Sequence, residues 1–80
     1  MPFILHTDAS DFAIGGILGQ KDEQGREHIV KYLHRTFNPA ERNYGATERE
    51  ACAAIWCIEK CHEYLIRQEF ELITDHQALK

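Results

Sequence analysis

Residues 4–8, Ile-Leu-His-Thr-Asp, and residues 71–75, Glu-Leu-Ile-Thr-Asp, decide the fold of this 80-residue chain. Both stretches have the apolar and β-branched composition of short strands, and each ends in Thr-Asp. An acid at the end of an apolar strand is costly to keep there unless a cation compensates its charge. A divalent metal is the obvious cation, and metals held by carboxylates usually serve phosphate chemistry. Asp8 and Asp75 are therefore the first candidates for a metal site.

The residues that follow the first stretch predict an antiparallel meander. Three strands are expected, at residues 3–8, 12–20 and 28–33. The polar residues 21–25 end in Gly and are typical of a hairpin turn. Gly15 and Gly16 interrupt the second strand and indicate a bulge or a close backbone contact there.

One long helix and a last strand complete the predicted fold. The helix is expected from residue 48 to about residue 66, because Pro and Gly are absent and helix-forming residues dominate. Thr47 is its predicted N-cap, and Glu50 three residues later matches a capping box. Residues 70–74 alternate as a strand, and residues 76–80 begin a further helix that the end of the chain cuts off. We therefore expect a single α/β domain over the whole chain, with an incomplete C-terminal part.

Strand connectivity predicts that Asp8, Glu50 and Asp75 lie together. If the last strand pairs in parallel with the first, the two Thr-Asp ends are neighbours at one edge of the sheet. The helix must run back antiparallel to the strand it feeds, so its N-terminus with Glu50 lies over that edge. The expected sheet is mixed, with the first three strands antiparallel, the fourth parallel to the first, and the helix packed on it.

Glu48 is the alternative to Glu50 at the helix start. The helix face that begins at Glu50 continues with apolar residues: Ala54, Cys57, Ile58, Cys61 and Leu65. The face that begins at Glu48 is half polar, which favours Glu50 as the inward acid. Each acid also has a purely structural interpretation, Glu50 as a capping residue and the two Asp residues as turn formers.

Charge and composition narrow the classes of function. A net charge of −4 argues against a simple electrostatic nucleic-acid binder, but not against an enzyme whose metals neutralise its own acids. No apolar run approaches the roughly 20 residues that cross a membrane, and the N-terminus does not have the pattern of a signal peptide. An intracellular setting is therefore expected.

The three cysteines, Cys52, Cys57 and Cys61, all fall in the predicted helix. As zinc ligands they would need a fourth partner such as His62, and their spacing matches no familiar zinc pattern. Small buried residues are the simpler interpretation.

Several motifs follow one another along nearly the whole chain. They are residues 7–11 (Thr-Asp-Ala-Ser-Asp), 15–20 (Gly-Gly-Ile-Leu-Gly-Gln), 41–44 (Glu-Arg-Asn-Tyr), 47–50 (Thr-Glu-Arg-Glu) and 74–79 (Thr-Asp-His-Gln-Ala-Leu). In this order they resemble the ribonuclease H domain of reverse transcriptases, above all that of gypsy-type long-terminal-repeat retrotransposons. Lys31, His34 and Arg67 depart from the family pattern, and none of these departures affects an acid.

The resemblance implies a ribonuclease H-like fold and a metal-dependent endonuclease that cleaves the RNA strand of RNA–DNA hybrids. It assigns Asp8, Glu50 and Asp75 to the binding of two Mg²⁺ (or Mn²⁺) ions, whereas the family's fourth acid falls beyond Lys80. The implied partners are the RNA–DNA hybrid and an adjacent polymerase domain of a polyprotein, with no membrane. The implied location is the cytoplasm or nucleus, with the retroelement particle.

Further residues are candidates for contacts to the hybrid by position alone: Ser10, Asn43, Tyr44 and Gln77. Two other functions stay open for this sequence. One is a non-catalytic tethering or remnant module that kept the fold, and the other is a different nuclease or an integrase on the same fold.

Overall fold

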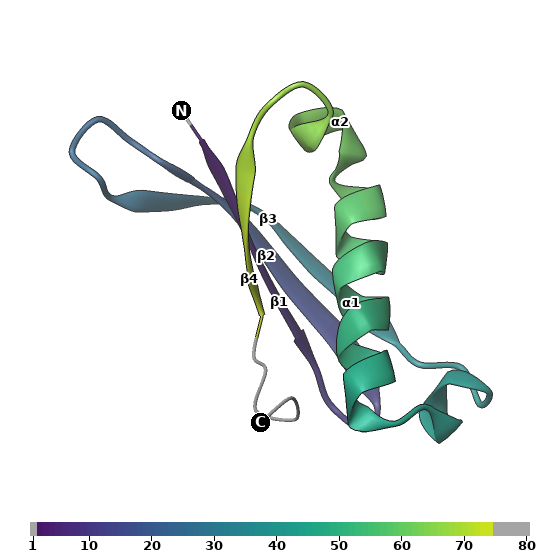
Figure 1. The fold of residues 1–80 in the computed structure, drawn as a ribbon. Coiled ribbons are helices and arrows are strands. Elements are labelled where there is room, and N and C mark those ends of the chain that lie inside the picture. Colours follow the sequence, from purple (N-terminus) through teal and green to yellow (C-terminus); the bar gives the residue numbers. More distant parts are fainter. Residues whose placement is uncertain (1, 75–80) are drawn as a thin grey trace.

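A mixed sheet forms the framework of the computed structural model, which describes residues 2–74 (Figure 1). Its strands are β1 (Phe3–Ala9), β2 (Ala13–Lys21), β3 (Glu27–Thr36) and β4 (Phe70–Thr74), in the spatial order β3-β2-β1-β4. The first three strands are antiparallel neighbours, and β4 pairs in parallel with β1. The predicted α/β fold and the directions of all four strands are therefore confirmed.

The long helix α1 (Ala46–Lys60) packs on one face of this sheet, over β1 and β2 (Figure 1). A short 3-10 helix, η1 (Glu41–Asn43), precedes it, and α2 (His62–Leu65) follows after a break at Cys61. The predicted helix over residues 48–66 is thus divided into two. The predicted helix at residues 76–80 lies outside the described residues.

The predicted start of the helix is wrong by two residues. Gly45, not Thr47, is the N-cap, and its N–H group donates a 2.9 Å hydrogen bond to the carboxylate of Glu48. A glycine has no side chain to cap with, so the acid three residues later satisfies the backbone instead. Glu50 is therefore not the capping residue.

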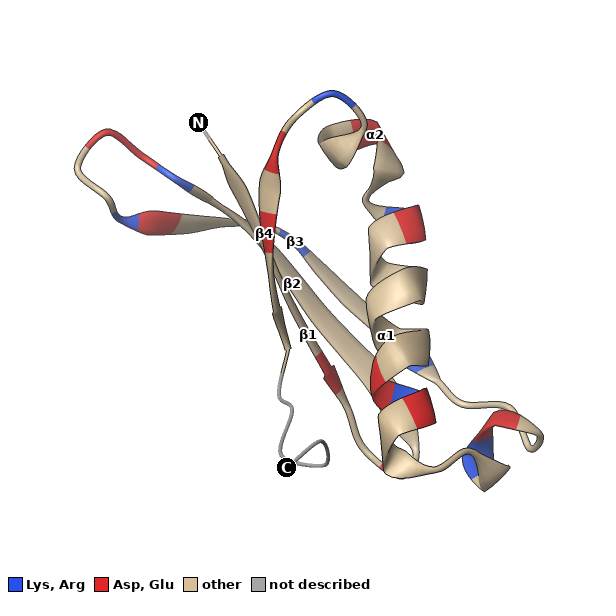
Figure 2. Cartoon of the chain, in the orientation of Figure 1, with Lys and Arg blue, Asp and Glu red and all other residues tan. Residues whose placement is uncertain are grey.

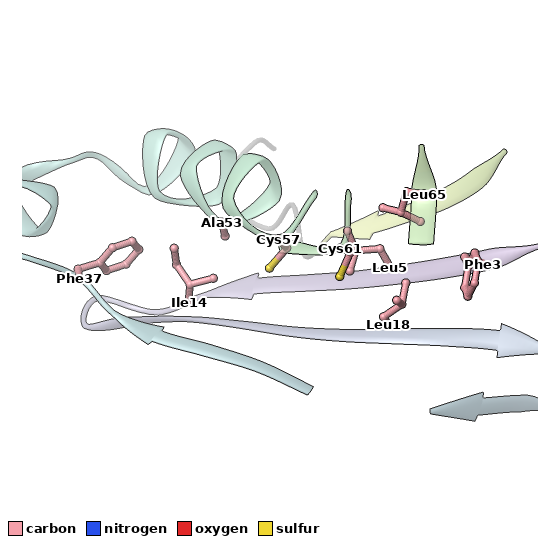
Figure 3. Packing of buried hydrophobic residues seen from close by; sticks show 9 residues of the cluster. All are labelled: Phe3, Leu5, Ile14, Leu18, Phe37, Ala53, Cys57, Cys61 and Leu65. Atoms are coloured by element: carbon pink, nitrogen blue, oxygen red, sulfur yellow. The ribbon is translucent and has the colours of Figure 1, made fainter. Parts of the chain in front are cut away.

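The core lies between α1 and the sheet, and Figure 3 shows its side chains. The buried cluster consists of Phe3, Leu5, Ile14, Leu18, Phe37, Ala53, Cys57, Cys61 and Leu65. Cys57 and Cys61 are fully buried, and all three cysteines are free thiols. Burial raises the pKa of Cys57 to about 11, as expected for a packing residue. Cys57 and Cys61 are thus small core residues, as predicted, and Cys52 is half-buried.

The predicted close contact at the glycines of β2 is confirmed at Gly16. A Cβ atom at this position would lie 2.7 Å from the Sγ atom of Cys57 and 3.2 Å from the Cδ1 atom of Leu33. The irregularity in strand pairing lies further along, between Leu18 and Gly19. Gly16 is therefore what allows α1 to approach the sheet so closely.

Candidate active site

Asp8 lies near the C-terminal end of β1 with an exposed side chain. Leu5 and Thr7 are buried beneath α1, so the alternation of the strand directs Asp8 to the sheet face that α1 does not cover. Its neighbour on β2 is Gly15, and a Cβ atom there would meet no atom within 4 Å. An open groove lined by His6, Asp8, Gly15 and Tyr32, among others, runs along this face. The Asp8 carboxylate is thus accessible from outside.

Glu50 is the one buried carboxylate among residues 2–74, with 9% of its surface exposed. It is the fifth residue of α1 and lies on the inward face that continues with Ala53 and Cys57. Glu48 is exposed and caps the helix, as described above. The expected inward position of Glu50 is confirmed, and its role in metal binding stays a prediction.

An ion pair links the surroundings of the two acids. The guanidinium group of Arg49 lies 3.1 Å from the Oδ1 atom of Asp11 and also donates to the carbonyl oxygen of Tyr44. Arg49 directly precedes Glu50, and Asp11 lies in the turn after Asp8. The pair therefore holds the β1–β2 turn against the start of α1. Figure 2 shows the acidic part of β1 and the charged first turns of α1 at the same end of the molecule.

The third predicted acid, Asp75, lies outside the described residues, as does Gln77. The parallel register is defined up to the preceding residue, because Thr7 pairs with Thr74. Within residues 2–74, no three His, Cys, Asp or Glu side chains gather closely enough to hold a metal ion. The described part of the chain thus places Asp8 and Glu50 at the same end of the sheet, without a complete ligand set. Asp8 lies on the open face of the sheet, and Glu50 lies on the inward face of α1.

Of the remaining candidates for substrate contacts, Ser10 has a local structural role, whereas Asn43 and Tyr44 are exposed. The Oγ atom of Ser10 accepts hydrogen bonds from the N–H groups of Phe12 and Ala13, at 3.2 and 3.1 Å, and closes the β1–β2 turn. Asn43 ends η1 with an exposed side chain, and Tyr44 is 37% exposed beside it. Both are open to a ligand.

Sequence reasoning missed the ion pair between Arg35 of β3 and Glu41 of η1. Its two N–O distances are 2.8 and 2.9 Å. The hydrogen bonds from Arg35, together with the N–H group of Asn38, lower the pKa of Glu41 to about 2. Arg35 also lies over the ring of Trp56, at 5.4 Å from its centroid. Arg35 and Glu41 lie six residues apart across a loop, and no local pattern in the sequence signals their contact.

The charges around Asp8 fit a divalent cation. Arg35 and Arg49 are engaged by Glu41 and Asp11, and no Lys, Arg or His of residues 2–74 forms an ion pair with Asp8. An oxygen-only donor set is the one Mg²⁺ prefers, and Mg²⁺ keeps several waters when few carboxylates bind it. Asp8 and Glu50 thus carry oxygen donors of the kind that Mg²⁺ prefers, and their role as metal ligands stays a prediction.

The mixed sheet with its packed helix is an α/β domain of the ribonuclease H type. All of residues 1–80 match the family model described as the RNase H-like domain found in reverse transcriptase, and the chain belongs to this family. The resemblance inferred from the ordered motifs is thereby confirmed.

The relatives are polyproteins of transposons. The chain is 43% identical over 79 residues to the retrovirus-related Pol polyprotein from transposon opus of Drosophila melanogaster, and 39% identical to the one from transposon gypsy of the same organism. It is 33% identical over 78 residues to the transposon Tf2-3 polyprotein of Schizosaccharomyces pombe. These alignments cover 95–98% of the chain but only 6–8% of each relative. The chain therefore corresponds to a small part of each polyprotein. In the described range, no helix is long and apolar enough to span a membrane.

Proposed function

We propose that this chain carries the ribonuclease H activity of a retroelement reverse transcriptase, the hydrolysis of the RNA strand in an RNA–DNA hybrid. One observation supports this most: an exposed acid, Asp8, and a buried acid, Glu50, share one end of a sheet whose β1 and β4 strands run in parallel. A capping role does not account for Glu50, since Glu48 caps the helix. Asp8 accepts one local hydrogen bond, from the N–H group of Ala9 at 3.0 Å, while Ser10 closes the turn.

Asp8, Glu50 and Asp75 would hold two Mg²⁺ or Mn²⁺ ions in this proposal. When bound, such ions supply an activated water and stabilise the leaving 3′ oxygen of the cleaved phosphodiester. Asp8 offers its carboxylate from the open sheet face, where a phosphate can reach it. Burial restricts the rotamers of Glu50, so its carboxylate has a defined direction before any ligand binds.

The proposed partners follow from the relatives and from the chemistry. The RNA–DNA hybrid is the substrate, and a polymerase domain of the same polyprotein is the neighbour, because the relatives are named Pol polyproteins. The proposed setting is intracellular, with the particle of the retroelement.

The test is Asp8→Asn in the natural protein that contains these 80 residues, hereafter the parent protein. We expect the Mg²⁺-dependent cleavage of a hybrid to fall by roughly 100-fold or more, because the amide cannot replace a charged metal ligand. Glu23→Gln, an exposed acid of the β2–β3 turn, is the matched control and should leave the rate unchanged.

Three outcomes would contradict the proposal. An Asp8→Asn protein that cleaves the hybrid at the wild-type rate removes Asp8 from the site. A wild-type protein that is inert with Mg²⁺ and Mn²⁺ indicates a tethering or remnant module. Preferential cleavage of a DNA duplex over the hybrid indicates another nuclease of the same fold.

A further inference from the structure

We infer that Phe12 and Arg42 form a binding surface for the sugar–phosphate backbone of the hybrid, next to the acids. This inference rests on the proposed function and adds a contact that positions the substrate. Phe12 lies in the β1–β2 turn with 63% of its surface exposed, although aromatic side chains are normally buried. The guanidinium group of Arg42, an exposed residue of η1, lies over this ring at 5.9 Å from its centroid.

Arg42 differs from the other two arginines at this end of the molecule, because no ion pair engages it within residues 2–74. Arg35 and Arg49 form ion pairs with Glu41 and Asp11. Arg42 forms none with any Asp or Glu of residues 2–74. Its side chain contacts the Phe12 ring, and no carboxylate of residues 2–74 occupies its N–H donors. A phosphate can therefore bind Arg42 without breaking an interaction that stabilises the domain.

Both residues are held in place by the backbone. The carbonyl oxygen of Phe12 accepts a 2.7 Å hydrogen bond from the N–H group of Phe37. The N–H group of Arg42 donates to the carbonyl oxygen of Asn38 at 3.1 Å. A surface that is ordered before binding loses little entropy when a ligand arrives, which favours a binding role for the exposed ring.

The Phe12–Arg42 pair lies beside the candidate acids. Asp11, which precedes Phe12, contacts Arg49, which precedes Glu50, at 3.1 Å. Figure 2 shows basic segments in η1 and in the first turns of α1 at the end of the molecule where the acidic part of β1 lies. A double helix is broader than the β1–β2 turn, so a hybrid bound at the acids also lies against this pair.

The chemistry of the pair matches a nucleic-acid backbone. Arginine binds phosphate oxygens through charge-assisted hydrogen bonds, and such contacts set the register of the bound duplex. Bases are stacked on one another inside a duplex, so Phe12 is expected to pack against a sugar and not between bases. The competing interpretation is that Arg42 only shields the Phe12 ring from water.

The experiment measures hybrid binding by the parent protein in an Asp8→Asn background, which prevents cleavage, over a range of salt concentrations. We expect Arg42→Gln to weaken binding roughly five- to tenfold and to reduce the slope of log affinity against log salt by about one. Arg42→Lys should retain the slope, because it retains the charge. Phe12→Ser should weaken binding several-fold at an unchanged slope. Arg67→Gln, an exposed arginine in the turn after α2, is the matched control.

Three kinds of result would overturn the inference or the proposed function on which it rests. Wild-type affinity and slope in Arg42→Gln overturn the inference, even if Asp8→Asn has confirmed the proposed nuclease. Equal losses in Arg42→Gln and Arg42→Lys, or lost hydrogen-exchange protection in η1, show a structural role and overturn it too. A wild-type protein that neither binds nor cleaves the hybrid overturns the proposed function itself.

Discussion

Arg35 and Glu41 are joined by two parallel hydrogen bonds across the connection from β3 to α1, with side chains only 29% and 13% exposed. The Glu41 carboxylate also accepts a hydrogen bond from the N–H group of Asn38. The side-chain oxygen of Asn38 accepts one from the N–H group of Glu41 in return. The ion pair and the two hydrogen bonds with Asn38 thus hold the segment that carries Arg42 and Tyr44 beside the start of α1.

This ion pair predicts a loss of stability in acid. The pKa of Glu41 is lowered from 4.5 to about 2, first by the Arg35 side chain and then by the Asn38 N–H group. A lowered pKa in the folded state means that the contribution is complete above pH 4.5 and is lost as the pH falls towards 2. Wild type should therefore exceed Glu41→Gln in hydrogen-exchange protection of residues 37–43 above pH 4.5. The difference should shrink between pH 4.5 and 2, and a pH-independent difference would contradict this.

Glu50 and Glu48 form a matched pair of acids two residues apart on the same helix. Glu50→Gln in the parent protein should reduce Mg²⁺-dependent cleavage by roughly 100-fold or more, because it removes a charged ligand. Glu48→Gln should retain activity, since the amide oxygen of Gln can still accept the hydrogen bond from the N–H group of Gly45. Cleavage rates of both variants test this.

A second readout separates metal binding from folding. Mg²⁺ should increase the hydrogen-exchange protection of β1 and α1 in wild type and in Glu48→Gln, but not in Glu50→Gln. The opposite assignment, with Glu48→Gln inactive and Glu50→Gln active, would place the exposed acid in the site.

The contact between Gly16 and Cys57 predicts a steric coupling. Gly16→Ala should destabilise the domain by about 1–3 kcal/mol, because its Cβ atom would lie 2.7 Å from a fully buried sulfur. Adding Cys57→Ala should recover part of this loss, since it removes the Sγ atom. Native-state hydrogen exchange of β1 measures both effects. Gly15→Ala is the control in the same strand, because its Cβ atom meets nothing within 4 Å.

The β2–β3 turn predicts a conformational requirement at Gly25. This residue has a φ angle of 81°, in the region that favours glycine. Gly25→Ala should cost about 1 kcal/mol, and Gly25→Asn should cost less, because Asn tolerates this region better. Exchange protection of β2 and β3 measures the cost. Equal stability of the Ala and Gly proteins would show that the turn changes its conformation.

Much of this fold follows from patterns that the sequence displays directly. The C-terminal ends of β1 and β4 were predictable to within one residue, because short apolar runs stop at polar turns. The parallel pairing of β4 with β1 follows from the helix that connects them. The inward face of α1 and of the residues after it was visible in the spacing of Cys57, Cys61 and Leu65.

Other features were not predicted, either because two local patterns compete or because the contact joins residues far apart in the sequence. The helix start was misplaced because Thr47 fits a capping pattern, whereas the structure uses the backbone of Gly45 and the side chain of Glu48. The link from Arg49 to Asp11 spans 38 residues and has no local signature. For the site, the position of Glu50 is confirmed, and Asp75 lies outside the described residues.

The two buried thiols give this domain a built-in chemical reporter. Cys57 of α1 and Cys61 directly after it lie in the core between helix and sheet, and neither exposes any surface (Figure 3). An alkylating reagent can reach them only when the helix lifts from the strands, because reaction needs an accessible thiolate. The half-buried Cys52 provides the reference reaction in the same molecule. The rate of alkylation of these two thiols therefore reports how readily the helix separates from the sheet in the native protein.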